Sequence, residues 1–451
     1  MNVLTTEDRP RVGGRNAKLA KAVEGMHVLV TDDSYYSTLG VVRSLGRKGI
    51  RVSVLADGPV RLASRSRYCS ARYSVPRSSG SSFFAAAADV LRQAHFDLVI
   101  PVGYAPTLSL AQHKAELNGL STIEVADGEK IRAAADKAYA NELAIAAGVP
   151  APRTVCPRSL DDLVRLSADL EYPVVIKQAG ETPKQPVQYA RSRFELINLY
   201  HLLCERNNGS GSALPLVQEY IPGYGCGFFA LYQHGVCKRI FMHRRVRETP
   251  PKGGISCCAA SHYDPKLKEY GTRLLDRLEW HGVAMVEFRY DVRDNDYKLM
   301  EINPKFWGSL DLSLAAGVDF PYYLCQMAQG QELDYSEEYD RNIRFHWPLL
   351  EMQHLWKRPL SFGAVLGDVF SPRVKSNLRL DDIWPNVLEP FSRTRVRACR
   401  LVSKSQPAAH ARLARDCAES RRSLALSPPP PEASWWLNRC TIPRPSRAPG
   451  K

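Results

Sequence analysis

The first third of the chain alternates short apolar runs with amphipathic segments. Residues 27–31 and 51–56 are apolar runs of strand length, and residues 39–45 between them carry apolar side chains at helical spacing. Two strands joined by so short a helical crossover pair in parallel. A further helix at 85–93 and another buried strand continue the pattern. We therefore predict an α/β domain over residues 26–125.

Beyond residue 126 the predicted order changes to α+β. A helical stretch over 127–147 ends at Gly148-Val149-Pro150, which is a helix stop signal. His234-Gly235 separates two apolar runs as a tight hairpin turn does, and a second hairpin follows at 282–302. The predicted organisation is a disordered N-terminal arm (1–25), the α/β domain (26–125), a second domain (126–335), an extension packed on the body (336–390) and a tail (391–451).

Composition narrows the class of protein. The chain has 451 residues, of which 44% are hydrophobic and 24% charged, so most of it is expected to fold as a globular protein. Its 11 cysteines are scattered and never spaced C-x-x-C, which excludes a disulfide framework or zinc ribbon and favours a reducing cytoplasm. We find no signal peptide and no apolar run of transmembrane length.

The net charge of +14 is unevenly distributed. Residues 391–451 contain thirteen Lys/Arg and three acids, a charge of +10, and residues 1–25 contain five and three, a charge of +2. The other 365 residues carry the remaining +2, so the body is not expected to bind nucleic acid. The proline-rich basic tail is predicted to be disordered, either as a solvated appendage or as a tether for an acidic partner.

Two carboxylates and an amide lie on the last predicted hairpin. Glu287 interrupts an apolar strand, and Glu301 and Asn303 share one face of the next strand. If the strands pair through a turn centred on 293–294, Glu287 lies opposite Glu301 or one residue away. Adjacent carboxylates repel unless a cation separates them, and oxygen ligands suit Mg²⁺. The alternative is an ordinary strand in which one acid pairs with an arginine such as Arg289.

Two lysines offer the complementary charge. Lys177 ends the apolar strand 173–177, and Lys137 lies on a helix after Asp136. Each lysine alone is typical of a solvated side chain. Together with the two acids and the amide, they form a set suited to a metal-bound phosphate.

In order along the chain, these motifs resemble the ATP-grasp superfamily from about residue 26 to about residue 330. The resemblance is carried by Asp136-Lys137-Ala138 with Gly148-Val149-Pro150, by Pro173-Val174-Val175-Ile176-Lys177, and by Gln218-Glu219-Tyr220-Ile221-Pro222-Gly223, which is similar to the adenine-binding hinge. It implies an ATP-grasp fold with an N-terminal Rossmann-like pre-ATP-grasp domain, a lid subdomain at about 150–222, a metal-binding subdomain at about 223–335 and a basic, partly disordered C-terminal tail.

The resemblance also implies ligands for individual residues. ATP and Mg²⁺ are the implied cofactors, with Mn²⁺ as an alternative metal. The implied ATP-binding residues are Lys137, Lys177, Lys184, Gln218, Glu219, Tyr220 and Ile221. The implied metal ligands are Glu287, Glu301 and Asn303.

Within the superfamily, residues 243–256 and 301–309 are similar to an uncharacterised carbamoyl-phosphate-synthase-like group. Lys305 stands where the family commonly has an arginine that steadies the reacting oxygen, which keeps the charge but loses the bidentate fork. The Gly253-Gly254 turn would offer backbone donors to an anion; the alternative is an ordinary hairpin loop. The implied catalytic residues are Lys305 and Arg247, and the implied substrate-binding residues are Gly253, Gly254 and Ser256.

The chain departs from the family in two places. The loop after Lys177 holds one glycine, where many members have a glycine-rich lid, and residues 224–227 lack the acid that often binds ribose. The implied activity is ADP-forming ligation of a small-molecule carboxylate to an amine through an acyl phosphate. The alternative is an ATP-binding module without turnover that recruits a partner through its basic tail. The sequence leaves the substrates and the oligomeric state undetermined.

Overall fold

The computed structural model describes residues 23–58, 61–75, 81–180, 187–207, 214–251 and 253–389. The chain divides into a compact unit over Met1–Glu389 and a second over Pro390–Lys451. The predicted arm before residue 23, the predicted tail over 391–451 and Lys184 therefore lie outside the described residues. Among the described helices, none combines the length and the apolar character needed to cross a membrane.

The N-terminal region is a parallel sheet with strand order β3-β2-β1-β4, which confirms the predicted α/β arrangement. Its third strand was not predicted because the sequence CSARYS shows no apolar alternation. Its strands are β1 (His27–Thr31), β2 (Arg51–Ala56), β3 (Cys69–Ser74) and β4 (Leu98–Ile100). Its helices are α2 (Tyr36–Gly46), η1 (Ala63–Arg65), α3 (Ser81–Gln93), α4 (Tyr104–Gln112) and η2 (Lys114–Leu117).

The helical stretch predicted over 127–147 is two helices, α5 (Gly128–Ala135) and α6 (Lys137–Ala146). The break falls at Asp136, whose backbone is extended and whose side chain accepts hydrogen bonds from the N–H groups of Ala138 and Tyr139. An aspartate that caps the next helix in this way ends the preceding one. The break puts Lys137 at the first residue of α6.

A small antiparallel sheet follows, with strand order β5-β8-β6-β7. One apolar cluster joins the sheet to its helices and includes the fully buried Leu163, Leu196 and Tyr200. The strands are β5 (Thr154–Val155), β6 (Val174–Lys177), β7 (Gln188–Ala190) and β8 (Leu216–Glu219). The helices are α7 (Leu160–Leu166), η3 (Ser167–Asp169) and α8 (Arg193–Asn207).

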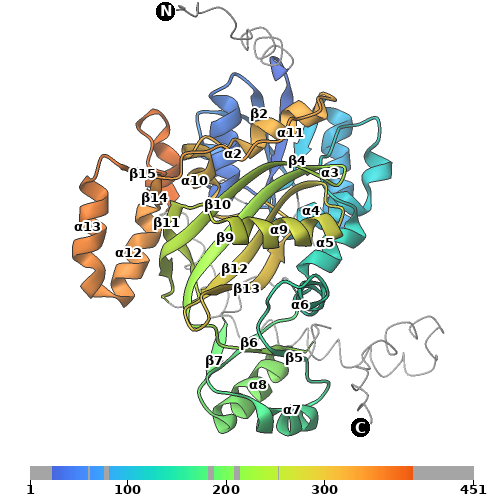
Figure 1. Ribbon diagram of the computed structural model, residues 1–451. Helices are drawn as coiled ribbons and strands as arrows, with labels where there is room; N and C mark the ends of the chain where they lie inside the picture. Colours follow the sequence, from blue (N-terminus) through green and yellow to red (C-terminus); the bar gives the residue numbers. More distant parts are fainter. Residues whose placement is uncertain are drawn as a thin grey trace, which may run out of the picture. The chain divides into compact units, whose positions relative to one another are not determined.

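The largest sheet has seven strands in the order β13-β12-β9-β10-β11-β14-β15. Both predicted hairpins are present, and His234 and Gly235 adopt the positive φ angles that a tight hairpin turn requires. The strands are β9 (Gly223–Gln233), β10 (Val236–Thr249), β11 (Ile255–Ser261), β12 (Gly282–Asp291), β13 (Asp296–Asn303), β14 (Arg344–His346) and β15 (Val374–Ser376). Helices α9 (Pro265–Arg277), α10 (Leu310–Ala315) and α11 (Phe320–Ala328) complete this region (Figure 1).

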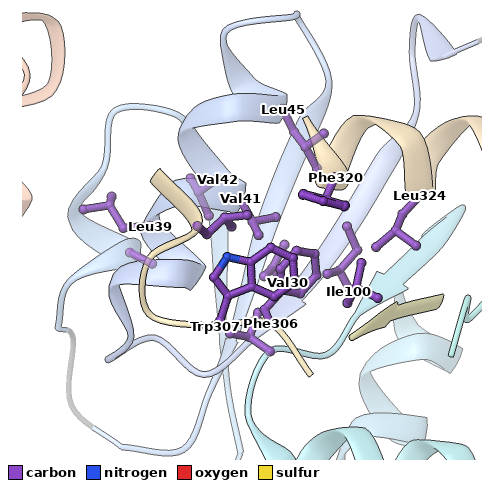
Figure 2. Close-up of a cluster of buried hydrophobic side chains, with 14 of the residues drawn as sticks. Val30, Leu39, Val41, Val42, Leu45, Ile100, Phe306, Trp307, Phe320 and Leu324 are labelled. Carbon is purple, nitrogen blue, oxygen red and sulfur yellow. The ribbon is translucent and has the colours of Figure 1, made fainter. Parts of the chain in front are cut away.

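One apolar core joins the N-terminal sheet to the segment that follows β13. Figure 2 shows Phe306 and Trp307 packed near Val30 of β1 and Phe320 of α11. These side chains are almost fully buried, so their packing holds in place the chain that leaves Asn303. The core therefore connects the end of the carboxylate hairpin to the first domain.

The segment predicted as an extension, 336–390, also supplies strands to the large sheet. β14 pairs with β11, and β15 pairs in parallel with β14. The segment is tied to the N-terminal region by an ion pair between Arg43 of α2 and Asp382, at 2.8 Å. Its helices are α12 (Pro348–Lys357), η4 (Pro359–Ser361), α13 (Phe362–Phe370) and η5 (Leu380–Asp382).

Candidate active site

A cavity of about 760 Å³ lies between the small sheet and the large sheet. The small sheet contributes the ends of β6 and β8, and the large sheet contributes parts of β10, β12 and β13. This volume is in the range of small-molecule sites. The two lysines, two glutamates and one asparagine that were predicted to act together all line it: Lys137, Lys177, Glu287, Glu301 and Asn303.

The two carboxylates face each other across the hairpin. Glu287 of β12 is the direct cross-strand partner of Glu301 of β13, which is one of the two positions that the turn predicted. Asn303 follows on the same face, and its Nδ2 donates a hydrogen bond to Glu301 Oε1 at 3.0 Å. The turn sets the pairing as far as Phe288 opposite Leu299, and an extra residue in β13, Met300, then shifts the register by one and brings Glu301 opposite Glu287.

The surroundings affect the two carboxylates in opposite directions. Burial raises the pKa of Glu287, and the charge of Glu301 adds to this effect, although Arg245 opposes it. Burial also raises the pKa of Glu301, but Lys137, the hydrogen bond from Asn303, and Lys177 together hold it below its usual range. Of the two, Glu301 is therefore the more strongly held as a carboxylate.

The two lysines approach the carboxylates from different elements. Lys137, at the start of α6, places Nζ 3.4 Å from Glu301 Oε2. Lys177, the last residue of β6, points Nζ toward Met300 Sδ at 4.0 Å. Burial lowers the pKa of Lys177, although Glu301 and Glu287 pull it upward. The two glutamates do not fully offset the cost of burying the Lys177 ammonium, so this group is suited to bind a further anion.

Arg247, which the resemblance implied as a catalytic residue, does not line the cavity, and Arg245 lines it instead. In the pairing of β10 with β11, Arg245 lies opposite Ala259 and Arg247 lies opposite Cys258, so β10 holds one extra residue. A bulge of this kind re-aims the side chains beside it, and a second register shift between Arg247 and Glu248 restores the original pairing. Arg245 donates to Glu287 Oε2 at 2.6 Å, whereas Arg247 pairs with Glu351 and Asp368 elsewhere.

The glycine turn is only partly as predicted. Gly253 and Gly254 line the cavity, but Ser256 does not. The N–H of Gly253 donates to Glu248 Oε2 at 2.9 Å, and the carbonyl of Gly254 accepts from Arg245 Nη1 at 3.1 Å. These bonds hold Arg245 in place. We therefore interpret the turn as a support for that arginine.

At the hinge, Glu219, Tyr220 and Ile221 line the cavity, whereas Gln218 does not. Gln218 turns its amide away and donates to Thr154 Oγ1 at 3.1 Å. Glu219 forms an ion pair with Arg293. The side chains of β8 alternate between the two faces, which explains why neighbouring hinge residues differ in this way.

Arginine 289 was considered in the sequence only as a partner for an acid, but it lines the cavity. Its Nε donates to the carbonyl of Ile221 at 2.7 Å, and its Nη2 donates to the carbonyl of Gly223 at 2.6 Å. It therefore fastens the hinge to β12. The sequence signal that Arg289 would line the cavity was its position two residues after Glu287, which places both side chains on the same face of the strand.

Lys305 lines the cavity beyond Asn303. Its Nζ lies 5.8 Å from the centre of the Tyr104 ring, within the range of a cation–π contact. Tyr104 begins α4, so Lys305 lies where the N-terminal region meets the large sheet. The positive charge of Lys305 also helps to lower the pKa of Glu301.

The described residues fit a magnesium ion. No group of three or more His, Cys, Asp and Glu suited to a metal occurs among them. Mg²⁺ needs fewer protein ligands, since one or two carboxylates with substrate phosphates and water complete its shell. Glu287 and Glu301, opposite each other, and the amide oxygen of Asn303 are the groups of this site that would hold it.

Charges on the cavity wall favour an anionic ligand. Of the described lining residues, five are cationic (Lys137, Lys177, Arg245, Arg289 and Lys305) and three are acidic (Glu219, Glu287 and Glu301). In a largely buried site an excess positive charge raises the affinity for anions. A phosphate-bearing ligand that binds together with a divalent cation would pair its phosphates with the cationic side chains and its cation with the acidic side chains.

Comparisons with known proteins support this arrangement. Residues 214–348 match the family model described as "ATP-grasp in the biosynthetic pathway with Ter operon". The chain is 26% identical over 215 residues to a D-aspartate ligase from Enterococcus faecium (strain Aus0004), a match covering 45% of this chain and 51% of the relative. The match thus spans about half of that relative's length.

Solved structures share the fold at low sequence identity. A biotin carboxylase–βγ-ATP complex from Campylobacter jejuni superposes with a TM-score of 0.60 and 16% identity, covering 72% of this chain and 75% of that one. An L-amino acid ligase from Bacillus licheniformis gives a TM-score of 0.52 and 16% identity, covering 69% and 75%. The chain therefore shares its fold with these structures, and its residues 214–348 are similar to ATP-grasp proteins.

Proposed function

We propose that this protein is an ADP-forming ligase that uses ATP to activate a carboxylate and joins it to an amine. The observation that carries the proposal is the meeting of Lys137 and Lys177 with Glu287, Glu301 and Asn303 in one cavity. These residues come from three separate parts of the chain. A site for a metal-bound triphosphate accounts for all five groups.

The two named ligases support the class of reaction and the choice of substrates to test. One relative is a D-aspartate ligase and one structure of the same fold is an L-amino acid ligase. Each name specifies an amino acid as a substrate of that protein. We therefore propose a small-molecule carboxylate and an amine as substrates here, with an amino acid as one of them.

The proposed reaction has two steps. A carboxylate oxygen attacks the γ-phosphorus of ATP, the bond to the bridging oxygen breaks, and an acyl phosphate and ADP result. The amine nitrogen then attacks the acyl carbon, phosphate leaves, and the ammonium proton is released to give an amide. Repulsion between the carboxylate and the triphosphate is the main obstacle to the first step.

The cationic residues of this chain would reduce that repulsion. We assign Lys137 and Lys177 to the phosphates because both reach the carboxylate pair that would hold the metal. Mg²⁺, when bound, supplies charge neutralisation to the phosphate oxygens. Lys305 is assigned to the developing charge of the acyl group, and Arg245, in place of Arg247, is assigned to the binding of the acid substrate.

Adenine would lie at the hinge. Tyr220 and Ile221 line the cavity beside the end of β8. The carbonyl of Ile221 already accepts from Arg289, so we assign Ile221 to apolar contact with the base. The Tyr220 ring meets the Tyr189 ring edge to face at 6.0 Å between centroids, and these two rings form an aromatic wall beside it.

The proposed location is the cytoplasm. None of the eight cysteines among the described residues forms a disulfide. Reducing compartments keep thiols in this form. The proposal is tested by fractionating cells and locating the full chain with an antibody.

The test is release of ADP and phosphate by the full chain with pooled amino acids as carboxylates and amines. We expect substrate-dependent release that Glu301→Ala and Lys177→Ala abolish. Glu279→Ala is the matched control, since that glutamate is exposed and lies outside the cavity lining. Retained turnover in both site variants would refute the assignment. Binding of Mg·ATP without ADP release over the whole pool would favour the alternative, a binding module that recruits a partner.

A further inference from the structure

The helix pair α12–α13 carries a large exposed apolar surface. Trp356 is 90% exposed, Leu360 is fully exposed, and Phe370 is 77% exposed. Figure 1 shows α12 and α13 side by side next to β14 and β15. We call the exposed apolar side chains of this pair the apolar face: Met352, Trp356, Leu360, Phe362, Leu366, Val369 and Phe370.

The orientation of α13 is the reverse of what packing alone would give. Only Val365 and Asp368 of this helix are buried. The bulky apolar residues Phe362, Leu366 and Phe370 point outward. A helix that served only to cover the sheet would turn these residues inward, so the outward apolar side chains indicate another surface that covers them.

Buried ion pairs anchor the helices instead. Glu351 of α12 accepts a hydrogen bond from Arg247 Nε at 2.6 Å and lies 2.9 Å from His346 Nδ1. Asp368 of α13 pairs with Arg247 and with Arg344, the latter at 3.0 Å. The two acids of these helices are therefore used internally, and neither is available at the surface.

The exposed charges within the segment that carries the apolar face, residues 348–380, are all positive. Between residues 348 and 380, the exposed charged side chains are Lys357, Arg358, Arg373 and Lys375. The only acids in that range are the buried Glu351 and Asp368. Aromatic and aliphatic side chains flanked by lysine and arginine, without exposed acids, are typical of surfaces that insert into an anionic lipid interface.

We propose that the apolar face of α12–α13 binds the surface of an anionic phospholipid bilayer. η4 (Pro359–Ser361) joins α12 to α13 and carries Leu360, so the most exposed apolar residues belong to one continuous helix–turn–helix segment. A second copy of the chain fits less well, because a two-fold contact through this face would bring the four cationic residues of each copy together.

This surface is separate from the cavity. No residue of the apolar face lines it, so lipid binding and ligase turnover can be measured independently. Arg247 is one connection between the two, since it lies two residues from Arg245 on β10 and pairs with an acid of each helix.

The experiment is flotation of the full chain with vesicles of phosphatidylcholine, with and without phosphatidylserine. We expect binding to the anionic vesicles. The triple variant Trp356→Ser/Leu360→Ser/Phe370→Ser should reduce the partition coefficient about tenfold or more, because three exposed apolar side chains are lost. Lys357→Gln/Arg358→Gln should reduce binding severalfold, and only to the anionic vesicles.

Phe194→Ser is the matched control, since this phenylalanine is 77% exposed on α8, and it should leave binding unchanged. All variants are checked by thermal unfolding. Equal binding of the triple variant and the parent would assign the attraction to other basic segments and overturn the proposal. Absence of vesicle binding would overturn it too, as would a dimer in sedimentation that the triple variant abolishes without any effect of lipid.

Discussion

Arg245 and Arg247 lie two residues apart on β10 but belong to two different clusters of buried charges. Arg245 faces the cavity with Glu287 and Glu248. Arg247 faces α12 and α13 and pairs with Glu351 and Asp368. The first cluster opens onto a space of about 760 Å³, whereas the second is closed by its own helices.

The difference between the clusters is their charge balance. Around Arg247, two arginines (247 and 344) meet two acids (351 and 368). Around the cavity, five cations meet three acids among the described lining residues. In a balanced buried cluster each charge has an opposite charge within the protein. A cluster with excess charge of one sign is stabilised when it binds an ion of the opposite sign. Charge balance therefore separates an anchoring role from a ligand-binding role here.

Removing the anchoring arginine should have the largest effect on stability. Arg247→Ala leaves Glu351 and Asp368 buried without their partner, so we expect a loss of about 3–5 kcal/mol in the free energy of unfolding. Urea denaturation measures this change. A loss below about 1 kcal/mol would contradict the anchoring role.

Removing the cavity arginine should affect turnover more than stability. Arg245→Ala should lower the rate of ADP release about 10²-fold or more, since a preorganised cation in the site is lost. Its ADP-release rate is compared with that of Arg247→Ala at a temperature where both are folded. Equal losses of turnover in the two variants would remove the distinction between the clusters.

A smaller change tests the position of Arg245 without removing its charge. A Cβ on Gly225 would lie 2.7 Å from Arg245 Cδ and 3.1 Å from its Nε. Gly225→Ala should therefore displace the guanidinium and lower turnover about tenfold. Gly308→Ala is the control, because a Cβ there meets no atom within 4 Å. Unchanged turnover in Gly225→Ala would show that the position of Arg245 does not limit the rate.

The smallest expected effect is a loss of stability at low pH. Burial raises the pKa of Asp368, but its hydrogen bonds with Arg247 and Arg344 outweigh burial and hold the pKa below its usual value. Such a group stabilises the fold above its unfolded pKa of about 3.9 and loses that contribution as pH falls through the folded pKa. The stability difference between the parent and Asp368→Asn should thus be full near neutral pH and shrink below about pH 4. Urea midpoints over this range provide the measurement, and a difference that grows in acid would contradict it.

Local patterns predicted much of the carboxylate site. The loop between β12 and β13 is short, so the position of its centre placed Glu287 opposite Glu301 or one residue away, and a bulge in β13 decided for Glu301. Alternation along β13 was enough to put Asn303 on the same face. The same local logic failed for Arg247, because it assumed a regular strand and the extra residue of the bulge is not visible in the sequence.

The sequence by itself determined most of the elements, the positions of the two hairpins and the kinds of side chain at the site, because these depend on neighbours close along the chain. Only the tertiary structure decided which arginine enters the cavity, that β14 joins β11, and that α13 turns its apolar residues outward. These features depend on partners about 100 residues away, such as Glu351 and Asp368 for Arg247. The energy of a buried charge is set by what surrounds it in space, and the local pattern of the chain does not contain that information.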